Sequence, residues 1–362
     1  MKSIPNIRII QLIDSLEPGG AERMAVSYAN GLFDKIDFSG LVATRKEGAL
    51  KEQLLPKVSY LFINKQGRFG LKSVLTLRAF LKTNKVNIIH AHGTSFFTAV
   101  LVKITLPTIK IIWHDHHGNR LSKKGITNKV LKAVSIFFNG VLTVNTEIEQ
   151  WAKNNLITKK VAYFPNFISS TNTKVESKTI LKGCDGKRIV FLANLKEPKN
   201  HLQILKAFAH SNSIELGWTL HLIGKDFNDD YSNELRAFIA ANKLYNLVFI
   251  YDSCNDIEFI LNQSNIGVLG STFEGFPVTL LEYGKSNLAV ISTNVGYCST
   301  IIQDGINGVL FNPNDPMEIE QKLNGLIGSE AKRIQYATTL YTQVMKKYSD
   351  KAIIDKYLEW LL

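Results

Sequence analysis

The stretch RIVFLANLKEPKNH, residues 188–201, changes from an apolar run into a polar loop. Short apolar runs rich in β-branched and aromatic residues are typical of buried strands. Five similar runs follow, each succeeded by a helical segment, at 218–224, 247–251, 265–270, 288–293 and 307–311. Strands that alternate with helices favour βαβ units and a parallel sheet. The stretch therefore predicts the first strand of an α/β domain and the loop at the carboxyl end of that strand.

The first half of the chain shows the same alternation. We expect strands at 7–13, 40–44, 59–63, 86–91, 109–114, 140–144 and 160–164. The polar stretch at 168–179 is either a linker or the exposed start of a second domain. The predicted fold class is α/β, with two doubly wound, Rossmann-like domains facing each other across a cleft. We expect an N-terminal domain at 1–167, a C-terminal domain at 168–345 and a helix at 346–362 that packs back toward the N-terminal domain.

Composition excludes several classes of protein. Hydrophobic residues make up 45% of the 362 residues, which indicates a globular chain, and no apolar run approaches the length of a membrane span. The first residues predict a strand and not a signal peptide. The three cysteines are widely spaced and form no CxxC motif, which favours a reducing cytoplasm over a disulfide framework or zinc site.

Positive charge is concentrated in the first half of the chain. Residues 1–165 contain 24 Lys and Arg against 10 Asp and Glu, a net charge of +14, while the remainder, with 19 against 21, carries −2. We therefore expect an anionic partner for the first half. Two basic amphipathic segments, 68–82 and 123–138, are either ordinary domain helices or a surface that faces an anionic cytoplasmic leaflet.

The segment FEGFPVTLLE, residues 273–282, holds two carboxylates around a Gly-Phe-Pro bend. Pro277 suits the first position of a helix, which places Glu274 on the preceding loop and Glu282 inside the helix, about 7–8 Å further along its axis. Two acceptors beside a helix N-terminus suit a phosphate between two sugars. The alternative is a capped surface helix with one unrelated acid.

Two further loops follow strands and precede helices. In DSLEPGGAER (14–23), Gly19 and Gly20 permit close approach to an anion, although the segment contains neither GxGxxG nor a Walker A sequence. A plain strand-to-helix turn is the alternative. In ANLKEPKNH (193–201), Lys199 can reach a phosphate or can be merely solvated.

Five of the eight histidines cluster at two strand ends, IIHAHG and WHDHHG. They are His90, His92, His114, His116 and His117. Three interpretations remain open, namely a metal site, structural polar histidines, or a histidine that faces a ligand. Only Asp115 supplies a nearby carboxylate and no cysteine is close, which disfavours a metal.

These motifs, in this order, resemble the retaining family 4 glycosyltransferases of the GT-B fold. GGAER (19–23) matches the first loop of that family and NLKEPKNH (194–201) its phosphate-binding loop. STFEGFPVTLLE (271–282) matches its E-x7-E donor motif, and DGINGVLF (304–311) a segment found in relatives. The resemblance covers most of the chain. It implies transfer of a sugar from a nucleotide-sugar donor to a glycan or polyprenyl-diphosphate-linked acceptor in cell-surface polysaccharide synthesis.

The resemblance assigns roles to individual residues. Glu274 contacts the donor sugar, Glu282 contacts the ribose, and Lys199 neutralises the diphosphate with help from the backbone N–H groups of Gly20, Val278 and Thr279. His114 is the histidine beside the donor sugar, with His116 as the alternative. The implied catalytic set is His114, Lys199 and Glu274, and the implied donor-site set is Gly19, Gly20, Asn194, Lys199, Glu274, Gly275, Phe276, Val278, Thr279 and Glu282; acceptor-side candidates are His92, His116 and His117.

Three positions differ from the family pattern. Asn194 stands where the family has a basic residue, Phe167 replaces glycine in PNG, and Ser299 or Thr300 replaces an acid. Neither a metal nor a cofactor is expected, because Lys199 and a helix N-terminus can stabilise the leaving diphosphate. We expect a cytoplasmic enzyme, peripheral on the inner face of the membrane.

Two rival functions fit parts of the sequence. A sugar-nucleotide 2-epimerase of the same fold needs catalytic carboxylates in the first half, which offers ten acids, none paired near the histidines. A basic nucleic-acid-binding protein would suit the pI of about 9.4, but no recognition motif accompanies it, so no nucleic-acid partner is expected.

Overall fold

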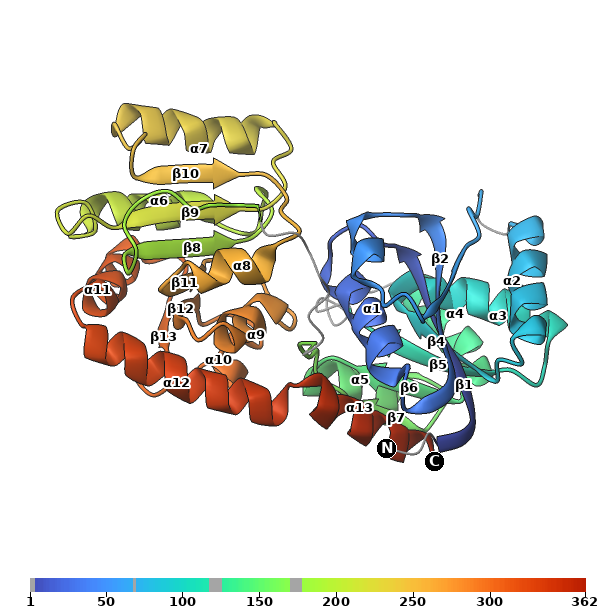
Figure 1. Ribbon diagram of the computed structural model, residues 1–362. Coiled ribbons are helices and arrows are strands. Elements are labelled where there is room, and N and C mark those ends of the chain that lie inside the picture. The colour runs from blue at the N-terminus through green and yellow to red at the C-terminus, as the bar shows by residue number, and fades with distance from the viewer. Residues whose placement is uncertain (1–3, 68–69, 117–125, 170–177) are drawn as a thin grey trace. The chain divides into compact units, whose positions relative to one another are not determined.

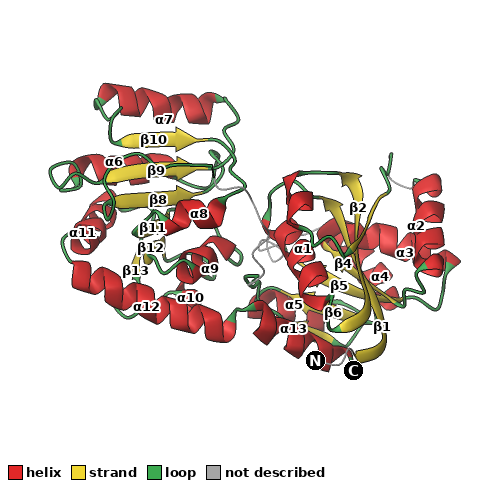
Figure 2. Ribbon diagram, in the orientation of Figure 1, coloured by secondary structure: helices red, strands yellow, loops and turns green. Residues whose placement is uncertain are grey.

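The computed structural model describes residues 4–67, 70–116, 126–169 and 178–362. The chain forms two compact units. The N-terminal unit comprises Met1–Thr173 and Tyr348–Leu362, and the C-terminal unit comprises Lys174–Lys347. Each unit contains one central sheet flanked by helices (Figure 2). None of the helices in the described ranges is long and apolar enough to cross a membrane.

The N-terminal unit is built on a seven-stranded parallel sheet in the order β3-β2-β1-β4-β5-β6-β7 (Figure 1). The strands are β1 (Ile4–Ser15), β2 (Ile36–Lys46), β3 (Ser59–Phe62), β4 (Ile88–His92), β5 (Lys110–Asp115), β6 (Gly140–Thr143) and β7 (Val161–Tyr163). The order of the strands reverses between β1 and β4. In doubly wound sheets, ligands bind beyond the carboxyl ends of the strands at such a switch point.

Helices cover both faces of this sheet. They are α1 (Gly20–Leu32), α2 (Leu71–Thr83), α3 (Phe96–Thr105), α4 (Ile126–Val134), α5 (Thr146–Asn155) and α13 (Asp350–Leu361), with short 3-10 turns η1 (Ala49–Gln53), η2 (Gly93–Ser95) and η4 (Ser135–Phe137). One apolar cluster joins α2, α3, α4 and α5 to one face of the sheet, and a second joins α1 and α13 to the other. Alternation along β4 explains the division, because Ile89 and Ala91 enter the first cluster while His90 and His92 point to the opposite face.

The C-terminal helix α13 is part of the N-terminal unit. Ile353, Ile354, Tyr357 and Leu358 are buried in one cluster with Tyr28 of α1. Burial of an apolar side chain of this size contributes roughly 1.5–3 kcal/mol, so four of them hold the helix firmly in place. The preceding helix, α12 (Glu330–Lys347), belongs to the C-terminal unit.

The C-terminal unit contains a six-stranded parallel sheet in the order β10-β9-β8-β11-β12-β13. Its strands are β8 (Arg188–Leu192), β9 (Thr219–Ile223), β10 (Val248–Tyr251), β11 (Ile266–Leu269), β12 (Ala289–Thr293) and β13 (Val309–Phe311). Its other helices are α6 (His201–His210), α7 (Asp230–Ala241), α8 (Ile257–Asn262), α9 (Val278–Lys285), α10 (Cys298–Ile301) and α11 (Pro316–Ile327). The predicted α/β class and doubly wound strand pattern are confirmed in both units, and the switch point here lies between β8 and β11.

Tyr283 of α9 fixes this switch point. Strands β8 and β11 pair only at their first residues, and they separate before reaching their carboxyl ends. The Tyr283 hydroxyl accepts the N–H of Leu192 at 2.8 Å and donates to the carbonyl of Val268 at 2.9 Å, which bridges the separated strands. Gly267 makes room, because a Cβ there would lie 2.5 Å from the Tyr283 ring. Helix α9 is thereby anchored to both strands.

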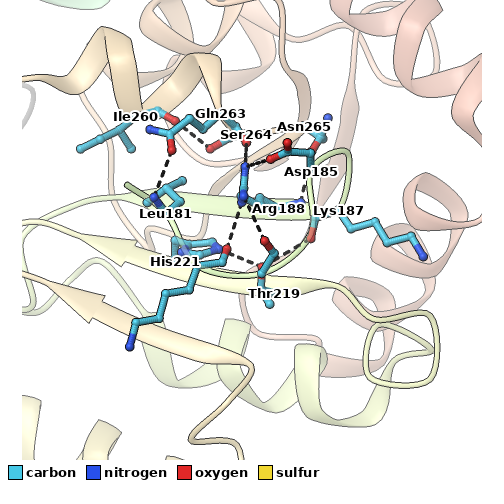
Figure 3. A network of polar contacts seen from close by, with 12 residues as sticks. Leu181, Asp185, Lys187, Arg188, Thr219, His221, Ile260, Gln263, Ser264 and Asn265 are labelled. Carbon is cyan, nitrogen blue, oxygen red and sulfur yellow. Dashed lines mark hydrogen bonds and ion pairs between the residues drawn. The ribbon is translucent and has the colours of Figure 1, made fainter. Parts of the chain in front are cut away.

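A buried arginine lies at the amino end of β8, at the opposite end of the strand from the switch point (Figure 3). The guanidinium of Arg188 donates to the carbonyls of Lys182, Gly183 and Gln263 at 2.9, 3.0 and 3.2 Å and pairs with Asp185 at 2.6 Å. Because an unmade hydrogen bond to a buried carbonyl is costly, this network holds the entry to β8 in one conformation.

Candidate functional site

Two loops of the C-terminal unit meet at its switch point, at the carboxyl ends of β8 and β11. The N–H of Thr272 donates to the carbonyl of Pro198 at 2.9 Å, and the side-chain amide of Asn200 donates to the carbonyl of Gly270 at 3.2 Å. These bonds fasten the loop after β8 to the loop after β11. They place Lys199 next to Glu274, which lies 75 residues further along the chain.

Lys199 and Glu274 form an ion pair that is largely shielded from water. The Lys199 Nζ lies 2.7 Å from Oε1 of Glu274, and the side chains are 26% and 11% exposed. The hydroxyl of Ser271 donates to the same Oε1 at 2.7 Å. A charge-assisted bond of this length is stronger than a neutral one, so the pair holds the carboxylate in a fixed position.

The loop after β12 supports Glu274 from behind. Gly296 has a φ of +54°, and a Cβ built there would lie only 1.8 Å from the carbonyl oxygen of Glu274. A side chain at position 296 would therefore displace the backbone that carries the carboxylate. Burial and the nearby Glu274 charge raise the pKa of Cys298, two residues further on, to about 12, which keeps that thiol unreactive.

The N-terminus of α9 opens beside this ion pair. Pro277 is the N-cap residue, so the helix begins at Val278, one residue later than the sequence predicts, and the Pro277 side chain makes no capping hydrogen bond. The first-turn N–H groups of Val278 and Thr279 carry the positive end of the helix dipole. Gly275 precedes the cap, and Phe276 is buried, with its ring 5.7 Å from that of Tyr297. This end of the helix suits an anion.

Glu282 and Asn194 lie on either side of the switch point. Glu282 is the fifth residue of α9, roughly 6 Å along the axis from Val278, and its Oε2 is buried. Asn194 follows β8, and its side-chain oxygen accepts the N–H of Lys225 at 3.0 Å. The amide thus joins the loops after β8 and β9 and supplies no charge. The ammonium groups of Lys196 and Lys225 lie over the Phe227 ring, 5.9 and 5.4 Å from its centre.

In the N-terminal unit, Gly19 and Gly20 begin α1 beyond the carboxyl end of β1. Gly19 is the extended N-cap residue and Gly20 the first helical residue. A Cβ on Gly19 would meet the Glu22 carboxylate at 2.3 Å, whereas one on Gly20 would meet nothing within 4 Å. The Glu22 side chain therefore folds back over the helix start, as the third-position acid of a capping box does.

The histidines of β4 and β5 form two hydrogen-bonded pairs. His92 Nδ1 lies 2.9 Å from His116 Nε2, and His90 Nε2 lies 3.3 Å from His114 Nδ1. His90 stacks on His92 with ring centres 4.4 Å apart, and His114 stacks on His116 at 4.0 Å. One pair thus lies above the other, with the His92–His116 pair nearer the carboxyl ends of the strands.

Burial decides the charge of these rings. Desolvation lowers the pKa of His90, His92 and His114 well below the usual value for histidine, so these three are neutral at pH 7. His114 is fully buried within β5, whereas His116 follows the end of the strand and is half-buried. His117 lies outside the described residues.

The three inner histidines bring possible metal-ligand nitrogens close together. One ring nitrogen from each of His90, His92 and His114 lies within 4.8 Å of the others. Tetrahedral zinc with nitrogen ligands at about 2.0–2.1 Å needs those nitrogens roughly 3.3 Å apart. The stacking of His90 on His92 also directs their in-plane lone pairs side by side and not toward one point. The geometry favours paired imidazoles over chelation.

Several contacts at these sites have little or no signal in the sequence. Ser271 and Gly296 fix Glu274, yet neither lies at an informative spacing from it. Gln11 accepts a hydrogen bond from His92, and the only sequence signal was one polar residue within the apolar run of the first strand. Tyr28 and Tyr357 enclose His90, with ring centres 4.8 and 5.2 Å away.

Comparison with known proteins places this geometry in a family. The model described as Glycosyltransferase Family 4 matches residues 18–171, and the model described as Glycosyl transferases group 1 matches residues 173–341. The chain is similar to a GalNAc-α-(1→4)-GalNAc-α-(1→3)-diNAcBac-PP-undecaprenol α-1,4-N-acetyl-D-galactosaminyltransferase of Campylobacter jejuni, at 23% identity over 98% of this chain and 97% of the relative. It is also similar to a UDP-Gal:α-D-GlcNAc-diphosphoundecaprenol α-1,3-galactosyltransferase of Escherichia coli, at 24% identity over 71% of this chain and 70% of the relative.

Solved structures share the fold. Anabaena HepE in complex with UDP and glucose superposes with a TM-score of 0.79 at 17% identity, covering 98% of this chain and 99% of that one. TarM of Staphylococcus aureus superposes with a TM-score of 0.76 at 12% identity, covering 98% and 99%. The two family models, which together span nearly the whole sequence, and these neighbours agree, and the chain belongs to the family 4 glycosyltransferases of the GT-B fold.

Proposed function

We propose that this glycosyltransferase transfers a sugar from a nucleoside-diphosphate sugar to a glycan or polyprenyl-diphosphate-linked acceptor during cell-surface polysaccharide synthesis. The donor site is the switch point of the C-terminal unit, and the reaction retains the anomeric configuration. The observation that supports this proposal most strongly is the Lys199–Glu274 ion pair beside the N-terminus of α9. The names of the Campylobacter and Escherichia relatives, both of which specify undecaprenol-linked acceptors, support the acceptor class.

The ion pair and the helix end suit the two halves of such a donor. A diphosphate at the start of α9 would receive the N–H groups of Val278 and Thr279 and share the Lys199 ammonium. Glu274 would then accept hydrogen bonds from hydroxyls of the sugar, and Glu282 from those of the ribose. Gly275 and Phe276 would form the bend between them.

In the chemical step, the bond between the anomeric carbon and the diphosphate oxygen breaks, and its electron pair stays with the diphosphate. Lys199 and the α9 N–H groups stabilise the charge that develops there, in a position fixed before the reaction. The acceptor hydroxyl attacks from the same face and passes its proton to the departing phosphate. Because a fixed cation and a helix end supply the charge, we propose that no metal takes part.

We propose His116 as the histidine that contacts the reacting sugar. The sequence offers both His114 and His116, but His114 is wholly enclosed by His90, His92, His116 and Tyr28. His116 follows the carboxyl end of β5, where ligands of doubly wound sheets bind. His114 would support it from below by stacking.

We propose further that the N-terminal unit binds the cytoplasmic face of an anionic membrane. The helix layer on one face of its sheet exposes Leu71 and Leu75 of α2, Ile104 of α3, and Val130, Ile136 and Phe137 of α4 and η4. Lys72, Lys82, Lys129 and Lys132 are exposed on the same elements, whereas Leu131 and Phe138 are core residues. Lysines near an anionic leaflet each contribute about 1 kcal/mol of attraction. Arg68, Lys123 and Lys124, expected on this surface, lie outside the described residues.

A panel of nucleoside-diphosphate sugars tests the donor site. We expect one donor to raise the unfolding temperature and, with a polyprenyl-diphosphate saccharide, to yield a product of retained anomeric configuration by proton NMR. Glu274→Ala should abolish turnover with the fold intact, and EDTA should leave turnover unchanged. If no donor shifts the unfolding temperature, or if Glu274→Ala remains fully active, the proposed site is wrong.

Vesicle sedimentation tests the membrane surface. The protein should pellet with phosphatidylglycerol-containing vesicles, but not with pure phosphatidylcholine, and less so as salt rises. Lys72→Glu with Lys82→Glu should reduce pelleting, while the matched pair Lys346→Glu and Lys347→Glu, exposed in the C-terminal unit, should not. Equal recovery in the supernatant with both lipids would contradict this part of the proposal.

A further inference from the structure

Lys65 is a buried lysine in the N-terminal unit. It follows β3, its backbone N–H donates to the carbonyl of Thr44 on β2 at 2.6 Å, and the residue is only 4% exposed. Its ammonium group lies 5.5 Å from the centre of the Phe97 ring, and no oxygen of the described residues accepts a hydrogen bond from it. An ammonium ion that is taken out of water without an acceptor is costly, and an anionic ligand would remove that cost.

The surroundings of Lys65 add positive charge to its own. Gly70, the N-cap residue of α2, has a φ of +50°, and a Cβ there would lie 2.7 Å from Cγ and 3.3 Å from Cε of Lys65. The ammonium group therefore lies beside the amino end of α2, which carries the positive end of the helix dipole and has no acidic residue in its first turn. Burial and the neighbouring Arg45 lower the pKa of Lys65, and the effect of Arg45 exceeds the opposing effect of Asp14.

The carboxylate of Asp14 already has other partners. Its Oδ1 accepts the hydroxyl of Thr44 at 2.5 Å, and its Oδ2 accepts the hydroxyl of Thr94 at 2.6 Å. The Arg45 Nε lies 4.0 Å from Oδ1, so one negative charge stands beside two cations and a helix end. Asp14 near the end of β1 and Thr94 after β4 flank the switch point of the sheet, where doubly wound folds bind ligands.

We propose that Lys65, Arg45 and the amino end of α2 bind the diphosphate of the polyprenyl-diphosphate-linked acceptor. The inference rests on the proposed function, because it takes the acceptor class from it. The Arg45 side chain is 45% exposed, and its planar fork of N–H donors matches phosphate oxygens. Lys65 supplies a compact charge, and the first N–H groups of α2 supply further donors. A diphosphate brings enough negative charge to balance both cations.

The position of α2 favours a lipid-linked diphosphate over a free one. Leu71, the first residue of α2, is 71% exposed, and Leu75, one turn later, is 52% exposed. Both belong to the surface that we propose to meet the membrane. The diphosphate of a polyprenyl lipid lies at the boundary between the hydrocarbon chain and water. The start of α2 places exposed apolar side chains directly beside the cation at Lys65, as such a boundary requires.

Calorimetric titration with inorganic pyrophosphate tests the anion site without any sugar. The full chain carries Lys199→Met throughout, so that the proposed donor site contributes little. We expect pyrophosphate to bind this chain, and we expect the further change Lys65→Met to raise the Kd at least about tenfold. Lys57→Met is the matched control, because Lys57 is exposed just before the same strand, and it should change the Kd less than about twofold. Absence of pyrophosphate binding, or equal effects of the two substitutions, overturns the proposal.

Thermal unfolding separates a binding role from a structural one. Lys65→Met keeps a buried stem of similar length and removes a charge without an acceptor, so the unfolding temperature of the chain without ligand should not fall. A clear fall would contradict the argument, because a lysine that stabilises the fold has a partner within the chain. If Lys65→Met does not fold, Arg45→Met replaces it in the titration and should raise the Kd for pyrophosphate at least about threefold. An unchanged Kd in that variant overturns the proposal as well.

Two acceptors identify the source of the diphosphate once a donor is known. Lys65→Met should raise the KM at least about tenfold for a saccharide on polyprenyl diphosphate. The KM for the same saccharide on an uncharged alkyl chain should change little, because that acceptor lacks the anion. An equal rise in KM for both acceptors overturns the assignment to the acceptor diphosphate. If pyrophosphate binding responds as expected but the wild type transfers no sugar, the anion site stands and the proposed function fails.

Discussion

Replacement of Lys199 by methionine should weaken binding of a nucleoside diphosphate far more than any other loss of charge on the same loop. The Nζ of Lys199 is 2.7 Å from Glu274, and its side chain is only 26% exposed, so little water competes for it. A hydrogen bond to a charged group contributes about 1.5–3 kcal/mol, which corresponds to roughly a 10- to 150-fold rise in Kd.

Lys196→Met is the matched control. Lys196 is exposed on the same loop, three residues earlier, and its ammonium lies over the Phe227 ring. Its charge is screened by solvent and salt, so its loss should change Kd by less than about threefold. Isothermal titration calorimetry of each variant with UDP, the nucleotide in the HepE structure, gives the comparison. If UDP does not bind, the nucleotide selected by the donor panel replaces it.

Equal losses of affinity in the two variants would refute the reasoning, because they would indicate a diffuse electrostatic effect and not a fixed contact. No loss in Lys199→Met would refute it as well. Thermal unfolding of both variants provides the check on folding, since Lys199→Met leaves Glu274 Oε1 with Ser271 as its remaining partner in the ion-pair network.

Three other outcomes are expected. Glu282→Ala should weaken nucleotide binding by about 1–3 kcal/mol in the same titration, while the unfolding temperature changes little. Gly296→Ala should lower both kcat and the unfolding temperature, because its Cβ would lie 1.8 Å from the Glu274 carbonyl oxygen at a φ of +54°. Gly305→Ala should lower only the unfolding temperature, because Gly305 has a φ of +73° but a Cβ there meets nothing within 4 Å. Urea denaturation should show that the free energy of unfolding of the N-terminal unit falls below pH 6.5. Unfolded imidazoles bind protons there, while burial lowers the pKa of His90, His92 and His114 in the folded state. The loss at pH 5.5 is roughly 1 kcal/mol for each ring, and a free energy of unfolding that does not change with pH would contradict the expectation.

The strands of both sheets could be predicted from sequence because each is a short apolar run that ends in polar or glycine residues. The alternation along IIHAH was equally informative, since it predicts that His90 and His92 share one face of β4. The alternation does not predict how deeply each side chain is buried. His114 and His116 have the same parity, and only the end of β5 after Asp115 separates the enclosed ring from the half-buried one.

Contacts between residues far apart in the chain could not be predicted from the sequence either. Glu274 follows the same pattern as the family motif, but its partners, Lys199 and the Gly296 backbone, reach it through separate loops whose meeting depends on packing. Gln11 is a single polar residue in an apolar run, and nothing in the order of residues connects it with His92, 81 positions later. Register between β1 and β4 supplies that connection, because Gln11 pairs directly with His90.

The membership of α13 in the N-terminal unit has a consequence for biosynthesis. A ribosome makes Ile353, Ile354, Tyr357 and Leu358 after all of the C-terminal unit, yet these side chains complete the cluster around Tyr28. The nascent chain therefore carries an open apolar surface, which includes Phe164 and Phe167, throughout the synthesis of about half its length. The C-terminal unit can fold before the N-terminal unit has received its last helix. The N-terminal unit therefore begins to emerge from the exit tunnel first but completes its folding last. Pulse proteolysis of stalled chains ending before and after α13 would separate the two stages.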